Sequence, residues 1–189
     1  MQRIYACALS VEDYVGRNAH EHVVSQPVCA FCGERAAQYR HGSYERSVIS
    51  RTGLLHAIKV ARFLCAACGH TISYLPSFAL SYRLLQAATF EAFLAGRWAG
   101  RDVQTRLELL HRYRRRMEAY RASLTRAIGY GFGRAPPQGC EPCAGVWAWL
   151  REACGSMESA TCRLVSEFKI TVFNRYQCHQ PNRGVSHHD

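Results

Sequence analysis

The sequence lacks the features expected of a secreted chain, a membrane protein or a common type of enzyme. No apolar run approaches the ~18 residues that suggest a membrane span. The first 22 residues contain Glu12, Asp13 and Glu21 and no apolar stretch of signal-peptide length. The GxSxG, P-loop, dinucleotide-binding and HExxH signatures are all missing. These absences predict a soluble, cytoplasmic, non-enzymatic protein with no membrane partner and no small-molecule substrate.

Lysine is also scarce, because Lys59 and Lys169 are the two lysines among 24 basic residues and the others are arginine. The formal net charge of +10 is concentrated in residues 76–135, where eleven basic residues face four acidic ones. Residues 136–189 contain five of each. A basic excess in the middle third indicates a surface for a polyanion, most commonly nucleic acid. Arginine suits contacts with phosphate and guanine, but a GC-rich genome produces the same bias.

Cysteine, in contrast, is abundant, with ten in the chain. In a reducing compartment these residues are poor candidates for a disulfide framework. The motif CxxCG occurs twice, at Cys29–Gly33 and Cys65–Gly69. A CxxC turn brings two sulfurs to one ion, and the glycine that follows permits a positive φ. The sequence therefore predicts a Zn²⁺ site, with four reduced cysteines as the alternative. The predicted ligands are Cys29, Cys32, Cys65 and Cys68.

The stretch between the two motifs has the pattern of a β-hairpin. Gln38–Ile49 and Leu54–Leu64 are rich in β-branched or aromatic residues and flank a Ser50–Gly53 turn. With a short strand at Thr71–Tyr74, this is the build of a zinc ribbon. Basic residues that include Arg40 and Arg46 alternate along the hairpin with tyrosines, which fits either a phosphate-facing sheet or a solvated one.

The basic region downstream has a helical pattern. A first helix is expected at Arg83–Leu94, and from Asp102, a good N-cap residue, apolar residues recur every three or four positions up to Ile128. One interpretation is a helix-turn-helix unit, with residues 111–124 in the major groove. Because no glycine or proline falls near Leu110, the alternative is that residues 102–128 form a single rod that pairs with another helix. The candidate nucleic-acid-binding residues are Arg112, Arg115, Arg116, Arg121, Arg40 and Arg46.

The chain divides by content into three regions. Residues 1–75 contain the ribbon and its lead-in, residues 76–133 are basic and helical, and residues 134–189 are rich in cysteine and aromatic residues. The last region begins with a Pro-Pro linker and ends in a polar tail. Its cysteines fit either a second zinc site or buried thiols in a small helical core. The residues concerned are Cys140, Cys143, Cys154, Cys162, Cys178 and His179.

Two quoted stretches carry a resemblance to a known family. RFLCAACGHTISYLPSFALSYRLLQAATFEAFLAG (Arg62–Gly96), together with HGSYER (His41–Arg46), resembles the N-terminal region of bacterial insertion-sequence transposases. It is also similar to short stand-alone proteins of mobile elements, and the likeness covers roughly residues 28–128. The resemblance implies a zinc-stabilised DNA-binding module in which the four cysteines occupy the metal positions. Residues after 135 contain too few carboxylates, in too short a stretch, for a two-Mg²⁺ nuclease core.

These observations predict an α+β protein in which a small zinc-ribbon sheet precedes a mainly helical, helix-turn-helix-like region. The expected function is zinc-dependent binding of double-stranded DNA, as an accessory or regulatory factor related to transposases but without a catalytic core. The alternative is an interaction adaptor that docks on a transposase, or self-associates through residues 102–128.

Overall fold

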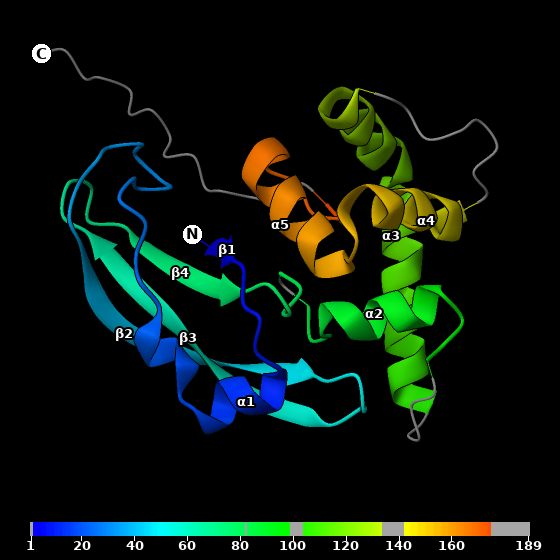
Figure 1. Cartoon of the computed structure of the whole chain (residues 1–189), viewed down its shortest axis with the longest axis horizontal. Helices are drawn as coiled ribbons and strands as arrows, with labels where there is room; N and C mark the ends of the chain where they lie inside the picture. The colour runs from blue at the N-terminus through cyan, green and yellow to red at the C-terminus, as the bar shows by residue number, and fades with distance from the viewer. Residues whose placement is uncertain (1, 82, 99–103, 134–141, 175–189) are drawn as a thin grey trace, which may run out of the picture.

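The chain folds into a sheet half and a helical half, which lie on the left and right of Figure 1. The structure, a computed structural model, describes residues 2–81, 83–98, 104–133 and 142–174, with the backbone alone at 104–106 and 142–143. The predicted α+β class, a small sheet followed by a helical region, is confirmed. Within the described ranges, no helix has both the length and the apolar character that a membrane span requires.

The sheet half contains four strands and two short helices, in the order β1 (Gln2–Tyr5), α1 (Val11–Gly16), the 3-10 helix η1 (Ala19–His22), β2 (Gln38–Ile49), β3 (Leu55–Cys65) and β4 (Thr71–Pro76). The helical half contains α2 (Ala87–Leu94), α3 (Gln104–Phe132), α4 (Pro142–Cys154) and α5 (Met157–Phe168).

The strands form one mixed sheet in the order β1-β4-β3-β2. β2 and β3 are the predicted antiparallel hairpin, and their register shifts between Arg40 and Ser43, where Gly42 has a φ of +78°. β1 adds a parallel strand beside β4 that the ribbon pattern did not predict. β1 ends at Tyr5 because the Cys7 amide donates to Ser77 Oγ (3.0 Å) rather than to a strand carbonyl.

Two small apolar clusters stabilise the sheet half. In one, Val11 and Tyr14 of α1 pack with Ile58 and Val60 of β3. The other contains Phe63, Ile72 and Tyr74 together with two cysteines, Cys29 and Cys65. The second cluster lies under the CxxC turns, so the metal-site candidates are continuous with the core of the sheet.

The connection between the halves is extended rather than helical. The Ile49 amide donates to the Leu84 carbonyl (2.6 Å), and the Gln86 amide donates to the Ile49 carbonyl (2.9 Å). Since these bonds hold the backbone against the end of β2, the helix predicted from Arg83 begins only at Ala87.

The longest helix, α3, runs without interruption from Gln104 to Phe132. The separate helix expected for residues 111–124 in the helix-turn-helix interpretation is therefore not formed, because nothing breaks the helical hydrogen-bond ladder near Leu110. The apolar stripe of α3 is buried against the other helices and the segment after α5, as the Phe90–Tyr113 and Tyr113–Phe173 ring contacts show. The buried residues of this stripe are Leu110, Tyr113, Met117, Leu124 and Ile128.

This helical core also contains the aromatic residues that suggested a small C-terminal core. Trp147 and Trp149 of α4 and Leu164 of α5 belong to the same cluster as the α3 stripe. Residues 76–133 and the described part of 134–189 therefore share one core. Of the predicted linker at 133–139, the structure describes only Gly133. The predicted polar tail also lies outside the described residues.

Candidate metal centre and basic helix

The two CxxCG motifs form turns with matching backbone geometry. The Gly33 amide donates to the Cys29 carbonyl (3.1 Å), and the Gly69 amide donates to the Cys65 carbonyl (2.9 Å). The two glycines have φ values of +78° and +66°. These are left-handed conformations, which side chains with a Cβ adopt at a cost of about 1–2 kcal/mol. The glycine that follows each motif is therefore what allows the chain to curl around a common point.

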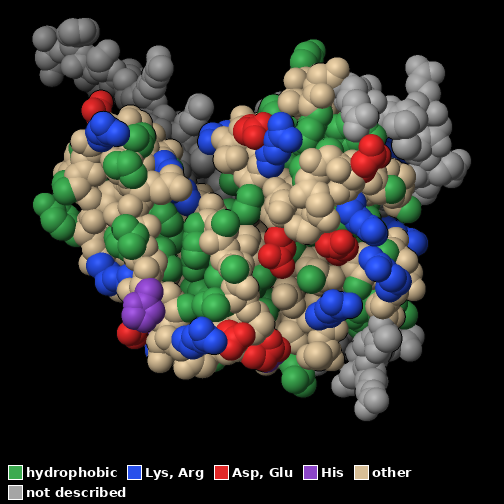
Figure 2. All heavy atoms as spheres, in the orientation of Figure 1, with side chains coloured by type: hydrophobic (Ala, Val, Ile, Leu, Met, Phe, Trp, Pro, Cys, Tyr) green, Lys and Arg blue, Asp and Glu red, His purple; other side chains and the backbone are tan. Residues whose placement is uncertain are grey.

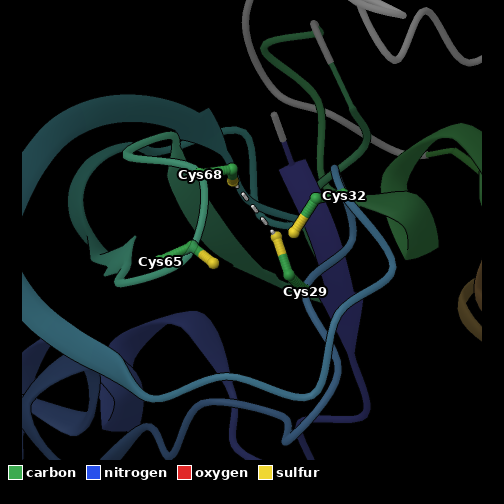
Figure 3. A group of neighbouring side chains, drawn as sticks. All are labelled: Cys29, Cys32, Cys65 and Cys68. Atoms are coloured by element: carbon green, nitrogen blue, oxygen red, sulfur yellow. Dashed lines mark hydrogen bonds between the residues drawn. The ribbon is translucent and has the colours of Figure 1, made fainter.

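The turns place the four predicted sulfurs together (Figure 3). All four Sγ atoms lie within 4.8 Å of one another. The Sγ atoms of Cys29 and Cys68 are 3.8 Å apart. Four sulfurs bound tetrahedrally at about 2.3 Å from a zinc ion are about 3.8 Å from each other. The cluster therefore has the size that a tetrahedral ion needs.

The surroundings of the sulfurs lower the pKa of one thiol, Cys65, and raise the pKa values of two others, Cys32 and Cys68. The Phe31 amide donates to Cys29 Sγ (3.3 Å), and backbone amides of Cys68 and Ala67 lower the pKa of Cys65 to about 7. Burial, in contrast, raises the pKa of Cys68, so binding of an ion there would have to release the proton of that thiol. Four cysteines in this arrangement can hold a metal ion.

Neighbouring side chains fix the turns in place. Arg3 of β1 donates to the Val28 carbonyl (2.7 Å), directly before the first turn. The rings of Phe31 and His70 stack across the two turns, with centroids 3.6 Å apart. His70, the neighbour of Gly69, is exposed and directs Nδ1 to the Cys68 carbonyl (3.0 Å), so it does not join the sulfurs. Sequence reasoning did not identify the roles of Arg3 and Phe31, because both depend on contacts between distant segments.

A second metal site cannot be assembled from the part of the chain that the structure describes. Within that part, the four sulfurs are the one group of three or more His, Cys, Asp or Glu side chains close enough to share an ion. Cys154 and Cys162 lie on α4 and α5 as free thiols. Cys140, Cys178, His179 and the side chain of Cys143 lie outside the described residues.

The two arginines proposed on the hairpin are bound to the protein's own backbone. Arg40 donates to the carbonyls of Glu21 (2.7 Å) and Val23 (3.0 Å) and lies over the Phe63 ring. Arg46 donates to the carbonyls of Leu80 and Arg83, which ties the sheet to the connecting segment. Both guanidinium groups therefore have a role in the fold that their sequence context did not reveal.

The arginines predicted on α3 lie differently. Arg112, Arg115 and Arg116 are exposed and, among the described residues, form no ion pair, whereas Arg121 pairs with Glu118 at 3.3 Å. At 100° per residue, Arg112 and Arg115 lie opposite the buried stripe, and so does the exposed Arg126. Figure 2 shows Lys and Arg side chains gathered on the right of the molecule, where Figure 1 draws α3.

Arg83 adds positive charge at the edge of this surface. Its guanidinium lies over the rings of Tyr113 (5.6 Å) and Phe173 (5.2 Å). Burial lowers its pKa, and the positive charge of Arg116 lowers it further. Two arginines that repel each other beside the exposed face of α3 favour an anion there. The sequence offered no signal for this pairing, because the two residues are 33 positions apart.

The fold and the cluster define a class: a ribbon-like sheet with a four-sulfur site that can hold a metal ion, followed by a helical bundle. Residues 29–113 match a family model described as "Domain of unknown function (DUF6431)". The match starts at the first of the four cysteines and ends inside α3, so it covers β2, β3, β4, α2 and the first part of the basic helix. No curated protein and no solved structure matches the chain.

Proposed function

We propose that this protein binds double-stranded DNA through the exposed face of α3, with a zinc ion stabilising the ribbon. The observation that carries this proposal is the row of exposed arginines on that face, which form no ion pair with the residues that the structure describes. From Arg112 to Arg126 the row extends about 21 Å at 1.5 Å per residue. It therefore has the length to contact several phosphates along a groove.

Zinc is the ion that best fits the four-sulfur site. Four thiolates at tetrahedral spacing are typical of structural zinc sites, which are closed by protein ligands alone. The ion would be held by Cys29, Cys32, Cys65 and Cys68 and would supply rigidity rather than chemistry. Its proposed role is to fix the turns against the sheet, whose remaining apolar clusters are small.

The arrangement of α2 and α3 supports nucleic-acid binding without a third helix. Figure 1 shows α2 lying across α3, and Phe90 of α2 packs against Tyr113 of α3. In helix-turn-helix proteins the two helices likewise meet at a large angle, and the second enters the major groove. On this basis α3 itself takes the role of the DNA-contacting helix.

The relation to transposases rests on the resemblance of Arg62–Gly96 and His41–Arg46 to their N-terminal region. With that resemblance, the proposed role is an accessory or regulatory factor that recognises element ends or an operator and performs no catalysis. The alternative, an adaptor that self-associates through the apolar stripe of α3, is less well supported because that stripe is buried within the chain. Docking on a transposase would need another surface.

The test is a titration of duplex DNA at increasing salt, followed by fluorescence anisotropy. For each phosphate contact, the logarithm of the affinity falls by about 0.9 per logarithmic unit of salt. Replacing Arg112, Arg115 and Arg116 by Gln should weaken binding and make the slope shallower by about 2.7 if each contacts one phosphate. A matched variant removes three exposed cations of the sheet half and should bind like wild type. Its substitutions are Arg17→Gln, Arg51→Gln and Lys59→Gln.

Two outcomes contradict the proposal. If wild-type protein shows no duplex binding at low salt, DNA is not its partner. If the sheet-half variant loses affinity and the α3 variant does not, the interface lies on the hairpin instead.

A further inference from the structure

A cavity of about 360 Å³ lies between β1 and the end of α5, beside the first CxxC turn. Figure 3 shows β1, in dark blue, passing next to Cys29 and Cys32, and Cys29 is part of the cavity wall. The opposite wall is the Cys162–Lys169 side of α5. The volume is at the small end of the range of about 300–1,000 Å³ typical of ligand pockets. It therefore suits one compact molecule held between the two halves.

The charged groups of the cavity are both cationic. Arg3 contributes from β1 and Lys169 from the residue that follows α5, and the described lining includes no Asp or Glu. The acidic side chain nearest in sequence, Glu167, is paired with Arg163 at 2.9 Å. Glu158 and Glu167 line a neighbouring crevice rather than this one. The cavity therefore favours an anion.

Both cations are held in position and keep hydrogen-bonding capacity. One terminal nitrogen of Arg3 donates to the Val28 carbonyl (2.7 Å), and its buried Nε–H has no acceptor among the described residues. A small rotation of the guanidinium would direct that N–H to a ligand oxygen. Lys169 has a left-handed backbone (φ 53°), and its Nζ donates to the Ser166 carbonyl (2.9 Å). An ammonium has three N–H groups, so further donors are available.

The rest of the wall is suited to an uncharged, partly apolar group. Ile4 and Val165 are apolar residues of the lining, which also includes Gln26, a residue whose side-chain amide can both donate and accept. A phosphate monoester carries a charge of about −1.5 to −2 at neutral pH, which two cations balance. We propose that this cavity binds a nucleoside phosphate monoester, with Arg3 and Lys169 on the phosphate and Ile4, Val165 and Gln26 around the nucleoside. The site requires neither the arginine face of α3 nor DNA binding by it.

The probe for the test is adenosine 5′-monophosphate, titrated into the full-length, metal-loaded protein by calorimetry. Adenosine and inorganic phosphate are titrated in parallel. Lys169→Asn removes the charge but keeps a residue that tolerates the left-handed conformation, and should weaken binding at least tenfold. Ser166→Trp places a large ring from an exposed position at the cavity and should abolish binding. Lys59→Gln, which changes the other lysine of the chain, should leave the affinity unchanged. Melting curves confirm that each variant is folded.

The site exists as proposed if the monophosphate binds more tightly than either adenosine or phosphate and both cavity variants lose that binding. The proposal is overturned if the nucleotide does not bind, if inorganic phosphate binds equally well, or if Ser166→Trp has no effect. Competition with a 5′-phosphorylated dinucleotide then identifies the source of the phosphate. If the dinucleotide displaces bound adenosine 5′-monophosphate as effectively as the mononucleotide itself does, the natural ligand is a nucleic-acid end. If the dinucleotide displaces it less effectively, the natural ligand is a free nucleotide. Because α3 variants are not involved, the result is independent of the DNA titration.

Discussion

The two halves of the molecule reach a defined structure by different physical means. In the helical half, a 29-residue helix buries an apolar stripe among aromatic and aliphatic side chains from α2, α4 and α5. In the sheet half, the apolar clusters are smaller, and one of them includes two of the four clustered cysteines. Apolar burial therefore organises the helical half, whereas the sheet half has less of it and contains a four-sulfur cluster that can hold a metal ion.

The largest expected effect is loss of the metal ligands. Cys65→Ser should abolish stoichiometric metal binding and leave the ends of β2 and β3 near the turns unprotected, because structural zinc contributes folding free energy directly. Hydrogen exchange measured by mass spectrometry should show fast exchange there and persistent protection in α3. A chelator should reproduce this pattern.

The control is Cys154→Ser, which changes a free thiol of α4 and should keep one metal ion per chain. If the chelator removes protection equally from both halves, they are one cooperative unit and the comparison fails.

A core substitution in α3 tests the opposite half. Leu124→Ala leaves a cavity at a fully buried position and should destabilise the protein by about 2–5 kcal/mol. The same change at Leu107, which is exposed on the same helix, should cost less than about 0.5 kcal/mol. Denaturant titration followed by circular dichroism measures both, and metal content should stay unchanged. Loss of metal in Leu124→Ala would show that the site depends on the helical core.

A smaller effect is expected at the glycines of the turns. Gly33→Ala forces a residue with a Cβ to adopt a φ of +78° and should destabilise the sheet half by about 1–2 kcal/mol. Gly16→Ala, which introduces the same methyl group into open space at the end of α1, should be neutral or slightly stabilising. The measurement is the midpoint of chelator-induced metal release. Equal midpoints for the two variants would mean that the left-handed turn does not limit metal binding.

The smallest effect concerns the boundary between the halves. Burial raises the pKa of Glu158 on α5, and the negative charge of Glu91 raises it further. The folded state therefore retains this proton at pH values where the unfolded state has lost it, so stability falls as pH rises through this range. Glu158→Gln should raise the melting temperature at pH 7 but not at pH 4, below the ordinary glutamate pKa of about 4.3. Glu108→Gln, at an exposed position of α3, should change the melting temperature equally at both pH values. If Glu158→Gln raises the melting temperature by the same amount at pH 7 and pH 4, the burial of a charged Glu158 is not the cause.

Local patterns predicted the hairpin and its turn closely, and long-range contacts account for what they did not predict. β-Branched and aromatic residues predicted β2 at Gln38–Ile49. This prediction is possible because a hairpin and its turn depend on residues that are close together in the sequence. The position of β1 depends on β4, and the start of α2 depends on backbone bonds to Ile49, so no local window contains that information.

The candidate sites followed the same division. The spacing of the cysteines predicted a cluster that the structure brings together. The hairpin arginines were placed by charge and aromatic neighbours alone, and these do not reveal that Arg46 reaches carbonyl groups of Leu80 and Arg83. The Arg3–Lys169 cavity joins residues from the two ends of the described chain, and no spacing rule addresses such a pair.

The parallel pairing of β1 also sets an order of events during synthesis. β1 is synthesised before β4, the strand it pairs with, and residues 6–70 separate the two. Both cysteine turns are therefore made before β1 has a place to dock, and Arg3 can then reach the Val28 carbonyl and fasten the first turn from outside. β1 can therefore take its place in the sheet only after β4 has been synthesised.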